Sequence, residues 1–187
     1  MRKKKENKTP QVILVAFIAF IMVTSVIGFI WSGSPKVRYN GFSFEQTPEG
    51  YYTEVGGKRV DFYYLPSDVE SISVPDGALA KLENTAQIDM TSSYNDTNNE
   101  AIALVMYEIS RALDGLYVRQ GFTEENPYEK PVITCNETGP VPVVHLMTSS
   151  ENDISVKDNC ITIEARDPRN FIIIKDRILY SLLGIIG

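Results

Sequence analysis

The sequence predicts an α+β protein in which an N-terminal transmembrane helix precedes one domain, built from an antiparallel strand meander and a helix-covered, partly parallel sheet. Three observations predict this: a long apolar run near the N-terminus, aromatic-rich segments separated by turn signals, and alternating strand-like and helix-like segments in the second half. Such alternation is typical of sheets that helices cover. The predicted divisions are residues 1–10, a transmembrane helix at 11–32 and a domain at 33–187.

The apolar run covers residues 12–31, and no charged side chain occurs between Thr9 and Pro35. As a helix, the 20 residues of this run are about 30 Å long, which matches the hydrocarbon core of a bilayer. Trp31 stands at the far end, and aromatic rings favour the membrane interface. We therefore predict that the lipid bilayer is the partner of residues 12–31.

The ten N-terminal residues are basic. They contain five cations against the single acid Glu6: Arg2, Lys3, Lys4, Lys5 and Lys8. Basic flanking residues stay on the cytoplasmic side of a bilayer, so we predict a cytoplasmic tail and an extracytoplasmic domain at the cell membrane. A cleaved signal peptide is the alternative, because Ser32-Gly33-Ser34 offers small residues for a cut near Ser34. The apolar segments of signal peptides are shorter, however, at about 7–15 residues.

The predicted outer domain is strongly acidic. From Ser32 onward there are 13 Lys and Arg residues against 23 Asp and Glu residues, a formal charge near −10. This charge disfavours DNA, RNA and anionic lipid as partners of the domain. We therefore expect no nucleic-acid partner, and a protein or another envelope component instead.

The two cysteines, Cys135 and Cys160, both fall in the predicted outer part. An oxidising exterior favours a disulfide between them, which would stabilise the fold by about 3 kcal/mol through the unfolded chain. The alternative is two free buried thiols. Two cysteines without a CxxC pair, with one distant histidine, fall short of a zinc site, so we expect neither a metal nor a cofactor.

Two glycosylation sequons lie in the same part of the chain. They begin at Asn95 and at Asn136, and such sites are used only outside the cytoplasm. Triplets of this kind also arise by chance, so they support the topology only weakly.

The first part of the outer domain is rich in aromatic residues and turn signals. It predicts three antiparallel strands, at 37–46, 51–55 and 58–66. The turns between them are residues 47–50 and the pair Gly56-Gly57, which is a tight-hairpin signal. The aromatic residues could form a carbohydrate-stacking surface, but their preference for strands explains them more simply.

The second part alternates strands with helices. The predicted helices are 78–84 capped by Asp76, an amphipathic helix from Asn98 or Asn99 to Gly115, and a last helix opened by Asp167-Pro168. The predicted strands are 86–90, 132–135, 141–147 and 160–165. The segment ISVKDN leads into the last of them, and residues 118–131 read as a loop. The last helix carries Lys175-Asp176-Arg177, which would cost about 2.5–3.5 kcal/mol per charge in a bilayer, so we predict a buried helix.

A heptapeptide occurs twice, as MTSSYND at 90–96 and as MTSSEND at 147–153, each after a predicted strand. If these strands are parallel neighbours, their polar side chains would face one crevice at the carboxyl ends of the strands. The candidates are Ser92, Ser93, Asn95, Ser149, Ser150 and Asn152. The interpretation we prefer is two turn sequences of common composition, since the chain that follows each copy differs.

Motifs for catalysis are absent from the sequence. It contains no GxSxG, SxxK, HExxH, Walker, GxGxxG or EF-hand pattern. The best hydrolase arrangement uses the only histidine, His145, as base, Ser149 or Ser92 as nucleophile and Asp89 to orient the base. A lone histidine inside a strand is more typical of a packed residue.

We therefore expect a single-pass membrane protein with a non-catalytic outer domain that serves as a binding or interaction module at the cell envelope. The alternative is a membrane-anchored hydrolase. The substitution His145→Ala separates the two, since a hydrolase would lose turnover and a binding module would change only in stability.

Overall fold

The computed structural model describes residues 9–31, 36–83, 85–113, 115–137 and 139–187 of the 187-residue chain. Within the first and fourth of these ranges it describes the side chains of residues 12–26 and 115–136. The predictions for the basic residues 1–8, the Trp31 side chain, the cleavage site near Ser34 and Thr138 of the second sequon lie outside these limits. The chain divides into two compact units, residues 1–35 and 36–187, which we describe separately.

The first unit contains one helix, α1 (Thr9–Trp31). The large apolar side chains between Val12 and Val26 are exposed by 46–66%. Within the described part of the chain, no helix combines the length and the apolarity that crossing a membrane requires. The helical conformation predicted for this segment is therefore observed, whereas the predicted membrane span is not confirmed.

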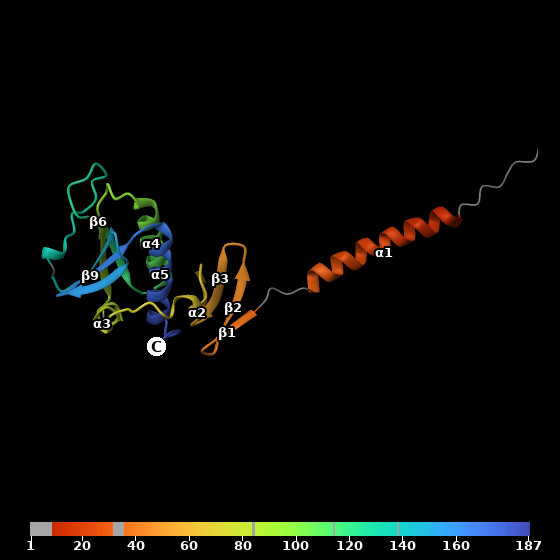
Figure 1. The fold of residues 1–187 in the computed structure, drawn as a ribbon, viewed down its shortest axis with the longest axis horizontal. Coiled ribbons are helices and arrows are strands. Elements are labelled where there is room, and N and C mark those ends of the chain that lie inside the picture. Colours follow the sequence, from red (N-terminus) through yellow and green to blue (C-terminus); the bar gives the residue numbers. More distant parts are fainter. Residues whose placement is uncertain (1–8, 32–35, 84, 114, 138) are drawn as a thin grey trace, which may run out of the picture. The chain divides into compact units, whose positions relative to one another are not determined.

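The second unit begins with an antiparallel meander of four strands in the order β1-β2-β3-β4 (Figure 1). They are β1 (Lys36–Tyr39), β2 (Phe42–Thr47), β3 (Gly50–Val55) and β4 (Lys58–Phe62). The Gly56-Gly57 pair joins β3 to β4 with φ angles of 60° and 80°, as the hairpin signal predicts. The turn at 47–50 is closed by a bond from the Gly50 N–H to the Thr47 hydroxyl (3.1 Å).

The prediction of three strands was wrong, because residues 37–46 form a hairpin rather than one strand. Asn40 and Gly41 adopt φ angles of 45° and 85°, the left-handed conformation that a two-residue hairpin turn needs. The Asn40 amide also donates to the Ile185 carbonyl (3.0 Å) near the C-terminus. The Asn-Gly pair is a strong local hairpin signal, so this turn was readable from the sequence.

The larger sheet has five strands in the order β6-β5-β7-β9-β8. They are β5 (Gln87–Ser92), β6 (Tyr117–Phe122), β7 (Val143–Thr148), β8 (Asp153–Lys157) and β9 (Cys160–Ala165). β6, β5, β7 and β9 are parallel, and β8 pairs antiparallel with β9. The predicted combination of an antiparallel sheet with a partly parallel sheet is thus confirmed.

Two predictions around β6 were wrong. Residues 117–122 form an edge strand where a loop was expected from residue 118, and residues 132–135 form no strand beyond a bridge between Val132 and Phe122. The short helix η1 (Cys135–Glu137) follows that bridge. An edge strand tolerates the polar, largely exposed side chains of β6, so its pattern does not distinguish it from a loop.

Helices cover one face of the larger sheet. The helices of this unit are α2 (Pro66–Val69), α3 (Asp76–Glu83), α4 (Asn99–Ala112) and α5 (Pro168–Leu182). α4 and α5 lie side by side, and the buried side of α4 carries the apolar residues predicted from its periodicity (Figure 1). The predicted cap of α5 is observed, since the Asp167 carboxylate accepts from the Asn170 N–H (3.0 Å).

α5 is the centre of the core, where the meander and the larger sheet meet in one apolar cluster. The Tyr180 ring stacks on Phe62 with centroids 4.1 Å apart, and meets Phe44 edge-on at 5.9 Å. The Tyr180 hydroxyl donates to the Tyr64 carbonyl (2.5 Å), so the buried ring has a partner for its polar end. The helix is therefore buried, as predicted.

Charged side chains of α5 are buried with their partners. Asp176 is 0% exposed and Lys175 1%. One Asp176 oxygen accepts the N–H groups of Tyr63 and Tyr64, both at 2.9 Å, and the other lies 2.5 Å from the Lys175 ammonium. Lys175 also donates to Glu108 of α4 at 2.6 Å. Burial raises the pKa of Asp176, although Lys175 and the two N–H groups act in the opposite direction.

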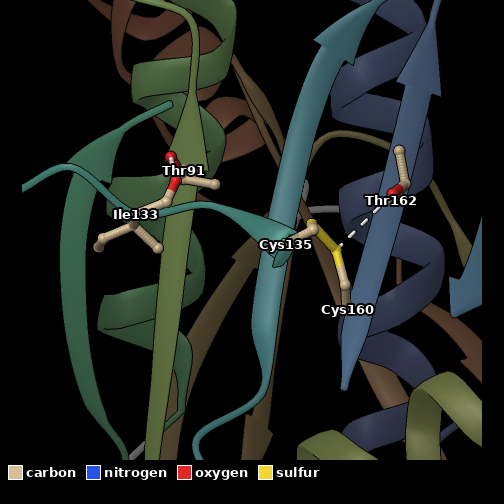
Figure 2. The surroundings of a disulfide bond; sticks show 5 residues. All are labelled: Thr91, Ile133, Cys135, Cys160 and Thr162. Carbon is tan, nitrogen blue, oxygen red and sulfur yellow. Dashed lines mark hydrogen bonds between the residues drawn. A yellow bond between two sulfur atoms is a disulfide. The ribbon is translucent and has the colours of Figure 1, made fainter. Parts of the chain in front are cut away.

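The opposite face of the larger sheet is crossed by the connection between β6 and β7. We call its described residues, 123–137 and 139–142, the strap. The strap carbonyl of Ile133 accepts from the Thr91 hydroxyl (2.9 Å). Cys135 and Cys160 lie at disulfide distance, with Cα atoms 5.4 Å apart, and Figure 2 shows the strap on the side of the sheet away from the helices. A Cβ atom on Gly121 would meet the Pro131 carbonyl at 2.4 Å, so the strap passes where only glycine leaves room.

We predict that Asp176→Ala lowers the free energy of unfolding by about 3–5 kcal/mol, because it leaves two backbone N–H groups without their buried acceptor and the buried Lys175 with Glu108 as its one remaining carboxylate. Urea unfolding of the full chain, followed by circular dichroism, measures this. The matched control is Asp61→Ala, which removes exposed ion pairs with Arg59 and Arg111 and should cost less than about 1 kcal/mol. Equal losses in the two variants would contradict the central role of Asp176.

We predict that replacing both Cys135 and Cys160 by alanine costs about 3 kcal/mol, because the unfolded chain gains the freedom that a closed loop of this length removes. The same urea experiment applies. Wild-type chain unfolded in reductant should match the double variant. An unchanged unfolding midpoint in both samples would show that the pair is not bonded in solution.

Candidate functional site

The two heptapeptides lie at the same edge of the larger sheet. β5 and β7 are parallel neighbours, with Met90 beside Val144 and Thr91 beside His145. Their carboxyl ends therefore lie at the same edge of the sheet, as the predicted crevice between the two copies requires. Met90 does not face Met147 across this pair, however, so the two copies are offset along the strands.

Asp96, the last residue of the first copy, binds the second copy. Its carboxylate accepts from the Thr148 N–H (2.9 Å), the Thr148 hydroxyl and the Asn98 N–H (2.8 Å). Burial raises the pKa of Asp96, but the bonds from Thr148 and Asn98 and the attraction of His145 outweigh it, so the net pKa lies below the ordinary value. The carboxylate therefore ties the loop after β5 to the end of β7.

Two other polar residues of the copies bond to segments outside them. The Ser93 hydroxyl donates to Glu124 (2.7 Å), and the Asn152 side chain accepts from the Arg166 N–H (3.0 Å). Ser92 is the one member of the six predicted crevice residues that lines the cavity described next.

A cavity of about 380 Å³ opens at this edge of the sheet, between α4 and β6. Its lining includes Ser92 of β5, Phe122 of β6, Tyr128 of the strap and Ile102, Ala103 and Met106 of α4. Clefts of roughly this size hold small ligands, and the carboxyl ends of parallel strands are where ligands bind in such sheets. The cavity is therefore the candidate binding site.

Aromatic rings form one side of the cavity. Phe122 meets Tyr94 edge-on with centroids 6.2 Å apart, and lies 5.9 Å from Tyr128. Sequence reasoning missed this group because it assigned residues 118–131 to a polar loop. The available signal was two aromatic residues, Phe122 and Tyr128, in an otherwise polar segment.

The residues of the hydrolase prediction are not joined by hydrogen bonds. Asp89 is held by Arg119 (Nε–Oδ1 2.9 Å) and by Gln87 (3.0 Å). His145 lies beside Thr91 in the register, and adjacent strand residues point to opposite faces, so Ser92 and His145 face opposite sides of the sheet. Among the described side chains, none of Asp89, Ser92 and Ser149 has a hydrogen bond to His145.

Burial and neighbouring charges shift the pKa values of the two titratable residues in the hydrolase prediction, His145 and Asp89. Burial lowers the pKa of His145, against the raising effect of Asp96, Glu124 and Glu164. Burial raises the pKa of Asp89, but the bonds from Arg119 and Gln87 outweigh it and leave the pKa below its ordinary value. The half-buried position of His145 thus favours its neutral imidazole, and the Asp89 carboxylate is ion-paired with Arg119.

Both sequon asparagines, Asn95 and Asn136, are exposed, the second next to the disulfide-distance pair. Among the residues with described side chains, no group of three or more histidine, cysteine, aspartate or glutamate side chains could hold a metal ion.

Comparison with known protein families, with curated protein sequences and with solved structures gives no match.

We predict that Asp96→Asn destabilises the protein by about 1–3 kcal/mol at pH 7, because it weakens charge-assisted bonds to Thr148 and Asn98. The folded pKa of Asp96 lies below that of the unfolded chain, so its contribution is present above about pH 4 and is lost as the pH falls through the folded pKa. Urea unfolding between pH 7 and pH 3 measures it. The difference in the free energy of unfolding between wild type and Asp96→Asn should disappear at acid pH. The exposed control Asp153→Asn should unfold with the same free energy as wild type at every pH. A difference that stays constant would refute the assignment.

Proposed function

We propose that the protein is a single-pass membrane protein, with its N-terminus in the cytoplasm and residues 36–187 outside, where this unit acts as a binding module at the cell envelope. The observation that carries the proposal is the pair of cysteine sulfurs at disulfide distance, in a chain that begins with a basic tail and an apolar helix. Disulfides persist in oxidising compartments.

The anchor is supported by the chemistry of α1. It contains 23 residues, about 35 Å of helix, and its described side chains, residues 12–26, are exposed and apolar except for Thr24 and Ser25. Large apolar side chains in water are costly, and a bilayer removes them from it. The basic residues before the helix favour the cytoplasmic side.

The outer location is supported by the acidic unit itself. Its net negative charge suits a solvated surface and disfavours nucleic acid, and the exposed Asn95 and Asn136 are available to an external glycosylation system. The partner we propose is an envelope component or protein that reaches the carboxyl edge of the larger sheet.

Binding is favoured over hydrolysis by the arrangement of the polar groups. A hydrolase needs a nucleophile within reach of its base, and Ser92 points away from His145 across the sheet. The cavity, in contrast, combines apolar and aromatic walls with polar side chains, which is typical of a binding pocket. The polar and charged lining residues are Ser92, Asn99, Glu100, Gln120 and Lys130.

Thiol labelling in native membranes tests the location. We predict that Cys135 and Cys160 accept a maleimide mass tag only after reduction, because an oxidising exterior keeps them bonded. Two tags without reductant in denatured membranes would contradict the proposal.

Two single-cysteine variants test on which side of the membrane each part of the chain lies. In a chain with both cysteines replaced by alanine, Asp61→Cys should react with an impermeant maleimide on intact cells, and Lys3→Cys only after lysis. Asp61 is suited to this because its side chain is 40% exposed. The reverse pattern would place residues 36–187 inside the cell.

A further inference from the structure

The floor of the cavity between α4 and β6 carries a hydroxyl without a partner. Ser92 lines the cavity and is 3% exposed, and no other described residue forms a hydrogen bond with its hydroxyl. The hydroxyl oxygen is not one of the fully buried side-chain atoms that lack a partner, so it is accessible from the cavity. A ligand with one polar group can therefore form a hydrogen bond with it.

The walls of the cavity select a flat apolar body. Ile102 and Met106 project from α4 on one side, and the rings of Phe122, Tyr94 and Tyr128 form the other. Aromatic rings favour edge-on and offset contacts with another ring, and a methionine sulfur favours the edge of a ring. Together these groups suit a planar aromatic ligand.

The charges around the cavity balance. Lys130 and Glu100 both line it and both are exposed, and no ion pair joins either to another described residue. The floor offers a hydroxyl and no charge. A charged group placed there would lose its water and gain only one hydrogen bond, which is unfavourable.

We propose that this cavity binds a small neutral aromatic molecule whose single hydrogen-bonding group reaches the Ser92 hydroxyl. The inference deepens the binding role proposed above and rests on it. It assigns Ser92 to ligand recognition, a role independent of His145 on the opposite face of the sheet.

Binding is measured on the full chain in lipid nanodiscs, with methyl-labelled Met and Ile as reporters and the free probe concentration fixed by dialysis. The probes are 2-naphthol, naphthalene and 2-naphthoate, which share one ring system and differ in the polar group. We expect 2-naphthol to bind most tightly and to shift the methyl signals of Met106 and Ile102, and 2-naphthoate to bind most weakly.

Three variants separate the contributions. Ser92→Ala should weaken 2-naphthol about five- to tenfold, the share of one hydrogen bond, and leave naphthalene within about twofold. Ala103→Trp places an indole on an exposed lining position and should abolish binding. Leu104→Trp is the matched control, because it adds the same indole to the next exposed position, which does not line this cavity.

Four results would overturn the inference: no shift at Met106 or Ile102 with any probe, tighter binding of 2-naphthoate, an equal effect of Ser92→Ala on 2-naphthol and naphthalene, or equal effects of the two tryptophan variants. The labelling experiments on membranes do not involve the cavity. If the labelling places residues 36–187 outside the cell and no probe binds, the proposed ligand is wrong and the proposed membrane topology stands. If a probe binds and the labelling places these residues inside the cell, the ligand proposal stands and the topology is wrong.

Discussion

The buried carboxylate of Asp176 is the interaction on which the second unit depends. It accepts two backbone N–H groups at the point where the meander leaves β4, and it lies against Lys175, which reaches Glu108 on α4. One helix thus connects the meander to the helix layer of the larger sheet. Removing a charge from water is unfavourable, so this arrangement persists only because each charge has its partners in place.

The two faces of the larger sheet are covered in different ways. The helix face is closed by α4 and α5, whereas the other face is crossed by the strap, which is held by the Ile133 carbonyl and by Cys135, at disulfide distance from Cys160 (Figure 2). The same division separates the cavity on the helix face from His145 on the strap face.

This separation decides which functional hypothesis the geometry favours. The hydrolase prediction places His145 in one site with Ser149 or Ser92. The pleat of the sheet puts Ser92 and His145 on opposite faces, and among the described side chains Ser149 has no hydrogen bond to His145. What Ser92 does have is an apolar, ring-lined cavity and no partner for its hydroxyl. A group in that position is suited to recognising a ligand.

The sequence by itself determined the features that have local causes: the helix from Thr9 to Trp31, the Gly56-Gly57 hairpin, the Asp167 cap and the alternation that makes the larger sheet partly parallel. The Asn40-Gly41 hairpin had such a cause as well and was overlooked. Only the tertiary structure decided that residues 117–122 form a strand, because their polar pattern becomes a strand only through hydrogen bonds to β5. The cavity also depends on the fold, since whether the Ser92 hydroxyl has a partner is settled by neighbours from β6, α4 and the strap that are remote in sequence.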